Sequence, residues 1–373
     1  MSEVSYGTTQ TEAQSEAREL LVKLVGIPSV TDEERACAEQ LKTYFQNHDR
    51  EVWIDEVGNV RAPADDGVLL TSHIDTVPGD IPVRVETMPT EKMPWGGDNS
   101  PTGEQGDVLW GRGSVDAKGP LASMAVAAVR TGASFIGVVG EEVDSRGSRY
   151  VIDDREAEPD AVINGEPSGW DGITLGYRGL VAGTYVATSE SGHTSRPENN
   201  AIQDAIQWWA NVEAEFDTDE WEPVFERVTP KPIDIDGGLS KDGLSVEATM
   251  DVQLRVPPSM STEEVIEITD GYLDVADRVN WADRVEPVMQ SPRTEVARAF
   301  RQAIRQQSGD PRLLRKTGTS DMNVFAQHWD CPMVTYGPGD SDLDHAPSER
   351  LALEEYDSAV AVLEHATERL LEQ

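Results

Sequence analysis

Residues 69–80 of the chain read LLTSHIDTVPGD. The apolar start is typical of a buried strand, and the run ends in His73 and Asp75, two residues apart. Because side chains at positions i and i+2 of a strand point to the same face, these two should project together from the carboxyl end of the strand. A core strand that finishes in two aligned polar groups predicts a functional site at that end.

Other apolar runs in the outer parts of the chain also lead to a histidine or a carboxylate. SFIGVVGEE ends in Glu141 and Glu142, DAVINGEP carries Glu166, and CPMVTYGPGD leads through a loop to DLDHAPSE with His345. WGRGSVDAKGP places Asp116 in a glycine-rich loop just before an expected helix. In an open parallel sheet the carboxyl ends of the strands converge on one crevice, where ligands bind. The sequence therefore predicts an α/β fold, with a mainly parallel sheet flanked by helices and a site at one edge.

The candidate residues point to a divalent metal. They comprise two histidines and several carboxylates without cysteine, a nitrogen and oxygen set that suits zinc, cobalt or manganese. The carboxylate of Asp75 can accept the proton on the second imidazole nitrogen of His73 and so fix its tautomer. Adjacent glutamates in a strand face opposite ways. Glu141 and Glu142 are therefore expected to divide the roles of ligand and base, and the residues alone leave open which does which.

The pattern changes between Glu166 and His345. The runs ITLGYRGLVAGTYVATSES and GLSVEATMDVQLRV are typical of strands, NAIQDAIQWWANVEAEF of an amphipathic helix, and STEEVIEITDGYLDVADRV of a helix that opens with a capping box from Ser261 to Glu264. We expect a small α+β unit at 174–285, inserted into a catalytic domain made of 1–173 and 286–373.

Local signals give further expectations for the first part of the chain. Apolar spacing predicts a helix over about 13–26, and Asp32 is a plausible N-cap for a second helix that reaches about His48. Small residues over 120–132 indicate a helix that packs closely on a sheet, and the polar, Gly- and Pro-rich segment 81–108 indicates an irregular loop.

The composition indicates the conditions in which the protein works rather than the reaction it catalyses. The chain has 373 residues, 69 acidic against 31 basic, and a formal net charge of −38, with the acids spread along its whole length. This pattern resembles proteins of extreme halophiles, because concentrated salt suppresses self-repulsion. It disfavours nucleic acid and anionic membranes as partners. The start of the sequence lacks a signal peptide's features, and Cys37 and Cys331 are expected to be buried free thiols of a cytoplasmic protein.

Several motifs together resemble one family. The chain is similar to the metallopeptidase and amidohydrolase family that contains carboxypeptidase G, aminoacylase, acetylornithine deacetylase and succinyl-diaminopimelate desuccinylase. The likeness covers nearly the whole length and rests on motifs in the family's order: SHIDTVP, GRGSVDAKG, GEEVDSRG, NGEPSG, SGHTSRP and DHAPSE. It implies a catalytic domain interrupted by a ferredoxin-like dimerisation domain that serves as a lid.

The resemblance also implies two metal ions per subunit, zinc before cobalt or manganese. Asp116 would bridge both ions. His73 and Glu166 would complete the ligands of one ion, and Glu142 and His345 those of the other.

Further roles follow from the same resemblance. Glu141 would be the general base, and Asp75 would lie behind the metal-binding histidine. His193 would stabilise the developing oxyanion in the partner's site of a homodimer, although a loop histidine taken alone is usually an ordinary surface residue. Arg255 resembles the family's carboxylate-binding arginine, for which a forked guanidinium is well shaped.

Within the family, the chain most resembles hydrolases that release lysine or ornithine from an amino-group carrier protein, LysW. ITLGYRGLVAGTYVATSESGHTSRP and KTGTSDMNVF carry this likeness and bring in Arg178, Ser320 and Asp321 as substrate-binding candidates. The implied substrate is an amino acid joined to the γ-carboxyl of the carrier's terminal glutamate.

The carrier would itself be acidic. Basic residues within or beside these motifs would then form a local rim for it: Arg178, Arg196, Arg255 and Lys316. A small-molecule deacylase acting on acetylornithine or succinyl-diaminopimelate is the nearest alternative. A catalytically silent metal-binding protein is a more remote one.

Overall fold

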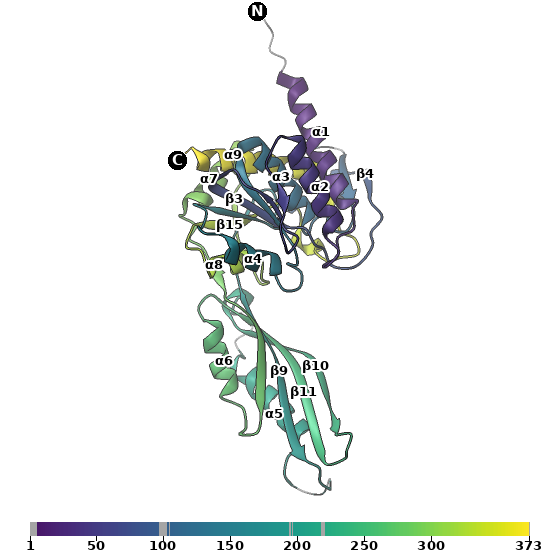
Figure 1. The fold of residues 1–373 in the computed structure, drawn as a ribbon, viewed down its shortest axis with the longest axis vertical. Helices are drawn as coiled ribbons and strands as arrows, with labels where there is room; N and C mark the ends of the chain where they lie inside the picture. The colour runs from purple at the N-terminus through teal and green to yellow at the C-terminus, as the bar shows by residue number, and fades with distance from the viewer. Residues whose placement is uncertain are drawn as a thin grey trace, which may run out of the picture. The chain divides into compact units, whose positions relative to one another are not determined.

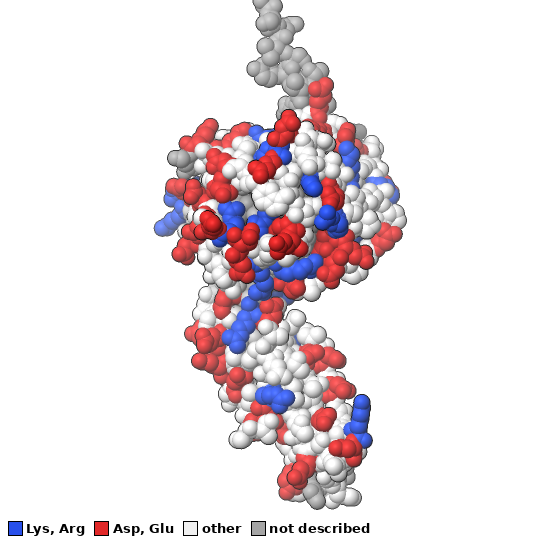
Figure 2. All heavy atoms as spheres, viewed as in Figure 1, with Lys and Arg blue, Asp and Glu red and all other residues white. Residues whose placement is uncertain are grey.

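The computed structural model describes residues 6–96, 103, 105–193, 195, 197–217 and 221–372. The chain folds into two compact units. The larger comprises residues up to 175, 290–314 and those from 324 on, and the smaller comprises 176–289 and 315–323. The acidic side chains are distributed over the visible face of both units rather than confined to one segment (Figure 2).

Most strands of the larger unit belong to a nine-stranded sheet (Figure 1). Its strands follow the order β1-β2-β6-β3-β7-β15-β8-β13, with β14 paired to β8. Four neighbouring strands, β6, β3, β7 and β15, run parallel, while the pairings on both sides of them are antiparallel. The predicted α/β class is confirmed, and the sheet is mixed around a parallel centre. The strand bounds are β1 Trp53–Ile54, β2 Val60–Ala62, β3 Asp65–His73, β6 Ala133–Val138, β7 Val162–Gly165, β8 Gly172–Tyr177, β13 Val288–Met289, β14 Arg312–Lys316 and β15 Met333–Tyr336.

Helices cover both faces of this sheet (Figure 1). One face packs against α1 Tyr6–Val25, α2 Arg35–Asn47, α3 Lys118–Thr131, α7 Glu295–Gln306 and α9 Leu353–Leu371, which share one apolar core with the sheet. The opposite side carries α4 Arg146–Asp154, and the short α8 spans Asp321–Ala326. The alanines of α3 are fully buried, as expected for a small-residue helix in close contact with a sheet. None of the helices in the described part of the chain has the length and hydropathy needed to span a bilayer.

Two local expectations for the larger unit are wrong. Asp32 does not cap α2: the helix begins at Arg35, and Asp32 has a φ of 76° in the preceding turn, a left-handed conformation that aspartate tolerates. The segment 81–108 is not all loop, because β4 Arg84–Met88 and β5 Gly106–Trp110 form a three-stranded sheet with β16 Arg350–Ala352. The first four residues of β4 are exposed, so the sequence has no apolar alternation there.

The smaller unit has a four-stranded antiparallel sheet and two helices. Its elements follow the chain as β9 Gly179–Glu190, α5 Ala201–Glu215, β10 Thr229–Leu239, β11 Ser245–Val256, α6 Thr262–Asp270 and β12 Arg278–Val285. The strand order β10-β11-β9-β12 with a βαββαβ chain order is ferredoxin-like. The predicted capping box of Ser261 and Glu264 is present at α6. β10 was not predicted, because TPKPIDIDGGL is interrupted by prolines and glycines and is largely exposed. The helix expected over STEEVIEITDGYLDVADRV ends at Asp270, and the last two residues of that run begin β12, which was not predicted either.

The observed smaller unit spans 176–289, against the expected 174–285, and it also includes the segment 315–323. The main-chain N–H of Arg178 donates to the carbonyl of Lys316 at 3.3 Å, and its Nε donates to the carbonyl of Thr317 at 3.0 Å. Asn323 donates its amide to the carbonyls of Arg178 and Glu286. These bonds attach residues 315–323 to the smaller unit, although that segment lies far from it in the sequence. No periodic pattern in the sequence predicts the contact. The division into catalytic and lid domains stays a prediction.

Candidate metal centre

Strand ends and the loops after them deliver the predicted site residues. His73 is the last residue of β3, and Glu166 directly follows β7. Glu142 lies four residues after β6, and Asp116 lies two residues before α3. His345 lies in the loop that follows β15, with a φ of 58°. All five belong to the larger unit.

Asp116 lies between the two histidines. Its Oδ1 is 3.1 Å from Nε2 of His73, and its Oδ2 is 3.2 Å from Nε2 of His345. Nε2 of His73 is 3.9 Å from a carboxylate oxygen of Glu166, and Nε2 of His345 is 3.1 Å from one of Glu142. The structure thus brings the five residues together as two imidazole and carboxylate pairs that share one aspartate. Their roles as ligands stay a prediction.

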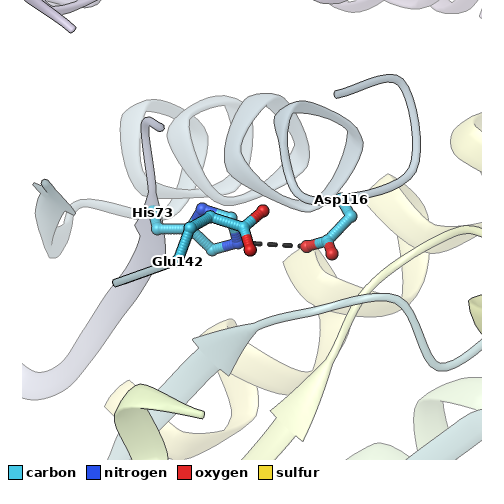
Figure 3. A group of neighbouring side chains, drawn as sticks. All are labelled: His73, Asp116 and Glu142. Carbon is cyan, nitrogen blue, oxygen red and sulfur yellow. Dashed lines mark hydrogen bonds and ion pairs between the residues drawn. The ribbon is translucent and has the colours of Figure 1, made fainter. Parts of the chain in front are cut away.

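The spacing of these atoms fits metal ligation. Two ligand atoms about 2.0–2.2 Å from one tetrahedral ion are separated by roughly 3.3–3.6 Å, within the range of the observed contacts. One ligand atom each from His73, Asp116 and Glu142 lies within 4.8 Å of the others (Figure 3). Oε1 of Glu142 is buried and has no hydrogen-bond partner among the described residues. A buried carboxylate oxygen without a donor is costly, and a cation would supply what it lacks.

The protonation of the site follows from the same contacts. Burial works against a charged imidazole, but hydrogen bonding to Asp116 and Asp75 raises the pKa of His73 well above its ordinary value. Its bond to Asp116 raises the pKa of His345 to about 9. Burial, and then the charge of Asp116, raises the pKa of Glu142 to about 6. Without metal, protons on His73 and His345 therefore balance the negative charge of the neighbouring carboxylates.

Glu141 and Glu142 do not extend the strand. β6 ends at Val138, and a turn follows in which the carbonyl of Gly140 accepts hydrogen bonds from the N–H groups of Asp144 and Ser145. The expectation that strand alternation separates the two glutamates is therefore wrong, and the turn sets their directions. The charge of Glu141 contributes to the raised pKa of His73.

Asp75 holds this turn. Its Oδ1 accepts the main-chain N–H of Glu141 at 3.1 Å, and its Oδ2 accepts that of Glu142 at 3.2 Å and the hydroxyl of Thr31 at 2.9 Å. Nδ1 of His73 lies 2.9 Å from the main-chain oxygen of Asp75 and 3.6 Å from its carboxylate. The main-chain carbonyl accepts the Nδ1 proton and fixes the tautomer of the histidine, and the carboxylate lies behind the same nitrogen. The role expected for that carboxylate stays a prediction.

Glycine at position 113 allows the loop before Asp116 to turn. Gly113 has a φ of 80°, and a Cβ there would lie 2.8 Å from the side chain of Thr76 and 3.0 Å from that of Lys118. The Asp116–Ala117 peptide bond is cis.

The substrate-binding candidates belong to the smaller unit. Arg178 is buried and donates to the carbonyls of Thr317, Val224 and Arg227 and to the hydroxyl of Thr229. These partners within the protein satisfy the guanidinium, so the burial of Arg178 needs no substrate to explain it. Arg255 is partly buried and bonds the hydroxyl of Thr319 at 3.4 Å. Among the described residues, no carboxylate lies within ion-pair distance of Arg255.

The remaining candidates have ordinary local contacts. Ser320 and Asp321 are buried at the start of α8, where the Ser320 hydroxyl accepts the N–H of Met322. His193 is exposed, and its Nδ1 accepts a hydrogen bond from the hydroxyl of Ser195 at 2.8 Å. Arg196, a member of the expected basic rim, lies outside the described residues.

Sequence reasoning missed the side chains that hold these loops. Thr31 has no neighbouring pattern that marks it, and only its bond to Asp75 reveals its place. Glu349 ends the DHAPSE motif and is fully buried; its position four residues after His345 was visible, but its contacts were not.

Three comparisons with known proteins agree with one another. The model of peptidase family M20/M25/M40 matches residues 69–369. A LysW-lysine hydrolase of Deinococcus radiodurans is 38% identical over 390 residues, covering 97% of this chain and 99% of the relative. A LysW-lysine/LysW-ornithine hydrolase of Sulfurisphaera tokodaii is 27% identical, covering 95% of each. The structure of an M20 family metallo-carboxypeptidase from Sulfolobus solfataricus superposes with a TM-score of 0.73 at 17% identity, covering 96% of this chain and all of the other.

The first prediction concerns protons released on metal binding. Below pH 9 the metal-free protein holds a proton on His345, whose pKa is raised to about 9, and a divalent ion must displace it. Zinc affinity should therefore rise with pH, by about tenfold per unit for each proton released, and this rise should weaken as the pH passes 9. Calorimetry of zinc binding at pH 7.5, in buffers of different ionisation enthalpy, measures the number of protons.

His345→Gln should release about one proton fewer than the native protein. His48→Gln should release the same number, because His48 pairs with Glu16 on another part of the larger unit. Zinc binding to the native protein at pH 7.5 without proton release would contradict the geometry.

Proposed function

The chain belongs to peptidase family M20/M25/M40, as its motifs predict, and from this premise we propose that it is a metal-dependent amidohydrolase. Its substrate is an amino-group carrier protein of the LysW type, and it releases lysine, ornithine or both from the carrier's terminal γ-glutamyl group. The observation that carries this proposal is the 38% identity, over 97% of the chain, to a relative named for that activity.

The donor set supports a site for two divalent ions. Asp116 and His73 with Glu166 would hold one ion, and Asp116 and Glu142 with His345 the other, since these atoms lie 3.1–3.9 Å apart in those groups. Zinc is the first candidate, ahead of cobalt and manganese. When bound, such a pair lowers the pKa of a water and polarises an amide carbonyl.

The chain's own residues then move protons and orient the substrate. Glu141 takes the proton of the attacking water and passes it to the leaving amine, because it adjoins Glu142 in the turn that Asp75 holds and is not one of the five expected ligands. Arg255 binds the carboxylate of the released amino acid with its forked guanidinium. A catalytically silent protein would have no need for a carboxylate at position 141 next to a complete donor set.

The proposal includes a cytoplasmic homodimer in which the smaller unit serves as the lid. His193 would then stabilise the oxyanion in the partner's site, which suits a histidine exposed on a loop of that unit. Both cysteines are free and buried, in keeping with a reducing compartment. A monomer with full activity in sedimentation and turnover measurements would contradict the shared site.

A local basic surface supports an acidic partner. Burial, and then the charges of Arg255 and Arg227, lower the pKa of Arg178 to about 10, and Nη1 of Arg178 donates to the main-chain carbonyl of Arg227 at 3.4 Å. In a chain with a net charge of −38, such a group of arginines on the smaller unit is a local exception. Lys316 lies in the segment bonded to Arg178.

The second prediction separates the base from the ligands. Glu141→Gln removes the proton acceptor and keeps the shape of the side chain, so kcat should fall by about 10²–10⁴-fold while the metal content is unchanged. Turnover and metal analysis of the same preparation measure both. Asp144→Asn removes a charge from an exposed position of the same turn and should leave kcat near the native value. Native turnover by Glu141→Gln would show that the base is misassigned.

The third prediction tests the carrier in multimolar salt. The Debye length is about 3 Å at 1 M, so short-range contacts decide recognition even between two acidic proteins. Carrier-linked lysine or ornithine should have a higher kcat/KM than acetylornithine. Lys316→Glu should weaken the carrier substrate more than the small one. Lys231→Glu, at an exposed position of β10 outside the motifs, should affect both equally.

An equal or higher kcat/KM for acetylornithine would replace the carrier assignment with the deacetylase alternative.

A further inference from the structure

Glu349 is a buried carboxylate that the proposed chemistry does not use. Its side chain is fully buried, and its two oxygens accept three main-chain N–H groups from the loop that carries Asp116. The distances are 3.1 Å from Gly113, 2.8 Å from Val115 and 3.1 Å from Asp116. Three N–H groups of one turn that converge on one carboxylate fix the path of that turn.

Arg112 extends this contact to two further loops. Its Nη1 donates to Oε2 of Glu349 at 2.7 Å, its Nε to the carbonyl of Gly79 at 3.2 Å, and its Nη2 to the carbonyl of His345 at 3.5 Å. Gly79 follows β3, the strand that ends in His73. The pair of Arg112 and Glu349 therefore joins the loops that follow β3, β5 and β15.

The contact of Glu349 with this loop matters because the loop carries Asp116. Its carboxylate must present one oxygen to each histidine, and the two contacts are 3.1 and 3.2 Å long. A small shift of the main chain at Asp116 would lengthen one contact or the other. Gly113 already requires a left-handed turn, with a φ of 80°, and the bonds from Glu349 hold the residues on both sides of Ser114.

We propose that Glu349 is a positioning residue of the metal centre, which acts through the main chain of Val115 and Asp116 to hold the shared carboxylate between His73 and His345. The inference rests on the proposed function, because it takes the five-residue group as the metal site.

The test replaces Glu349 and measures zinc binding and loop order separately. Glu349→Gln keeps the shape but places an amide donor against N–H donors, so one bond at least is lost. Loss of such an outer partner costs about 10–100-fold in metal affinity. Competition with a chelator should therefore show zinc affinity lowered by about that factor. Hydrogen exchange in the metal-free protein should be faster over residues 111–118, while exchange elsewhere is unchanged. With saturating zinc, kcat should fall more than KM changes.

Two further variants separate positioning from general stability. Asp357→Asn removes the charge of a partly buried partner of Arg18, 2.7 Å away between α1 and α9, and should lower Tm without changing zinc affinity or exchange over 111–118. Glu349→Asp keeps the charge on a shorter side chain, and its zinc affinity should lie between those of the native protein and Glu349→Gln. If Glu349→Gln does not fold in high salt, Glu349→Asp decides the question.

Native zinc affinity and native exchange over 111–118 in a folded Glu349 variant would overturn the inference while leaving the proposed function intact. A native protein that binds no zinc would instead overturn the proposed metal site. The exchange measurement on metal-free protein would still report whether Glu349 orders the loop.

Discussion

Buried carboxylates that accept main-chain N–H groups hold the loops at the carboxyl edge of the sheet. Asp75 binds the turn of Glu141 and Glu142, and Glu349 binds the loop of Asp116. A third, Glu355, accepts the N–H groups of Gly96, Trp170 and Gly339 at 3.0–3.3 Å. Each bond fixes backbone rather than another side chain. The site residues therefore lie on loops whose backbone is held by buried carboxylates.

Burying these carboxylates costs free energy, and their hydrogen bonds offset that cost. Burial of a carboxylate is unfavourable unless donors surround it, and burial raises the pKa of Glu355 to about 7. Charge-assisted hydrogen bonds contribute about 1.5–3 kcal/mol each, so three N–H donors can keep such a group in place. The donor side chains of the candidate centre are different, because Oε1 of Glu142 is buried without a partner among the described residues. Asp75, Glu349 and Glu355 are satisfied by main-chain donors, whereas Glu142 keeps one buried oxygen that a cation would satisfy.

The sequence predicted the parts of the protein that follow from periodicity and from motifs. The parallel strands that end near His73 and Glu166 are visible as apolar runs, and Ser261 with Glu264 marks a helix start. The convergence of five donors was inferred from the general rule that ligands bind at strand ends. What escaped prediction depends on contacts between distant segments. The bond from Thr31 to Asp75 spans 44 positions and that from Glu349 to Asp116 spans 233, and no local pattern encodes either. The exposed strand β4 lacks the alternation that would reveal it.

The most direct test of the account is the number of divalent ions bound per chain. The protein, purified in high salt and saturated with zinc, should hold two ions per chain by elemental analysis, because Asp116 faces one histidine with each oxygen. A chelator should remove both ions and abolish amide hydrolysis, and zinc, cobalt or manganese should restore it. A preparation that is free of metal and fully active would contradict the account.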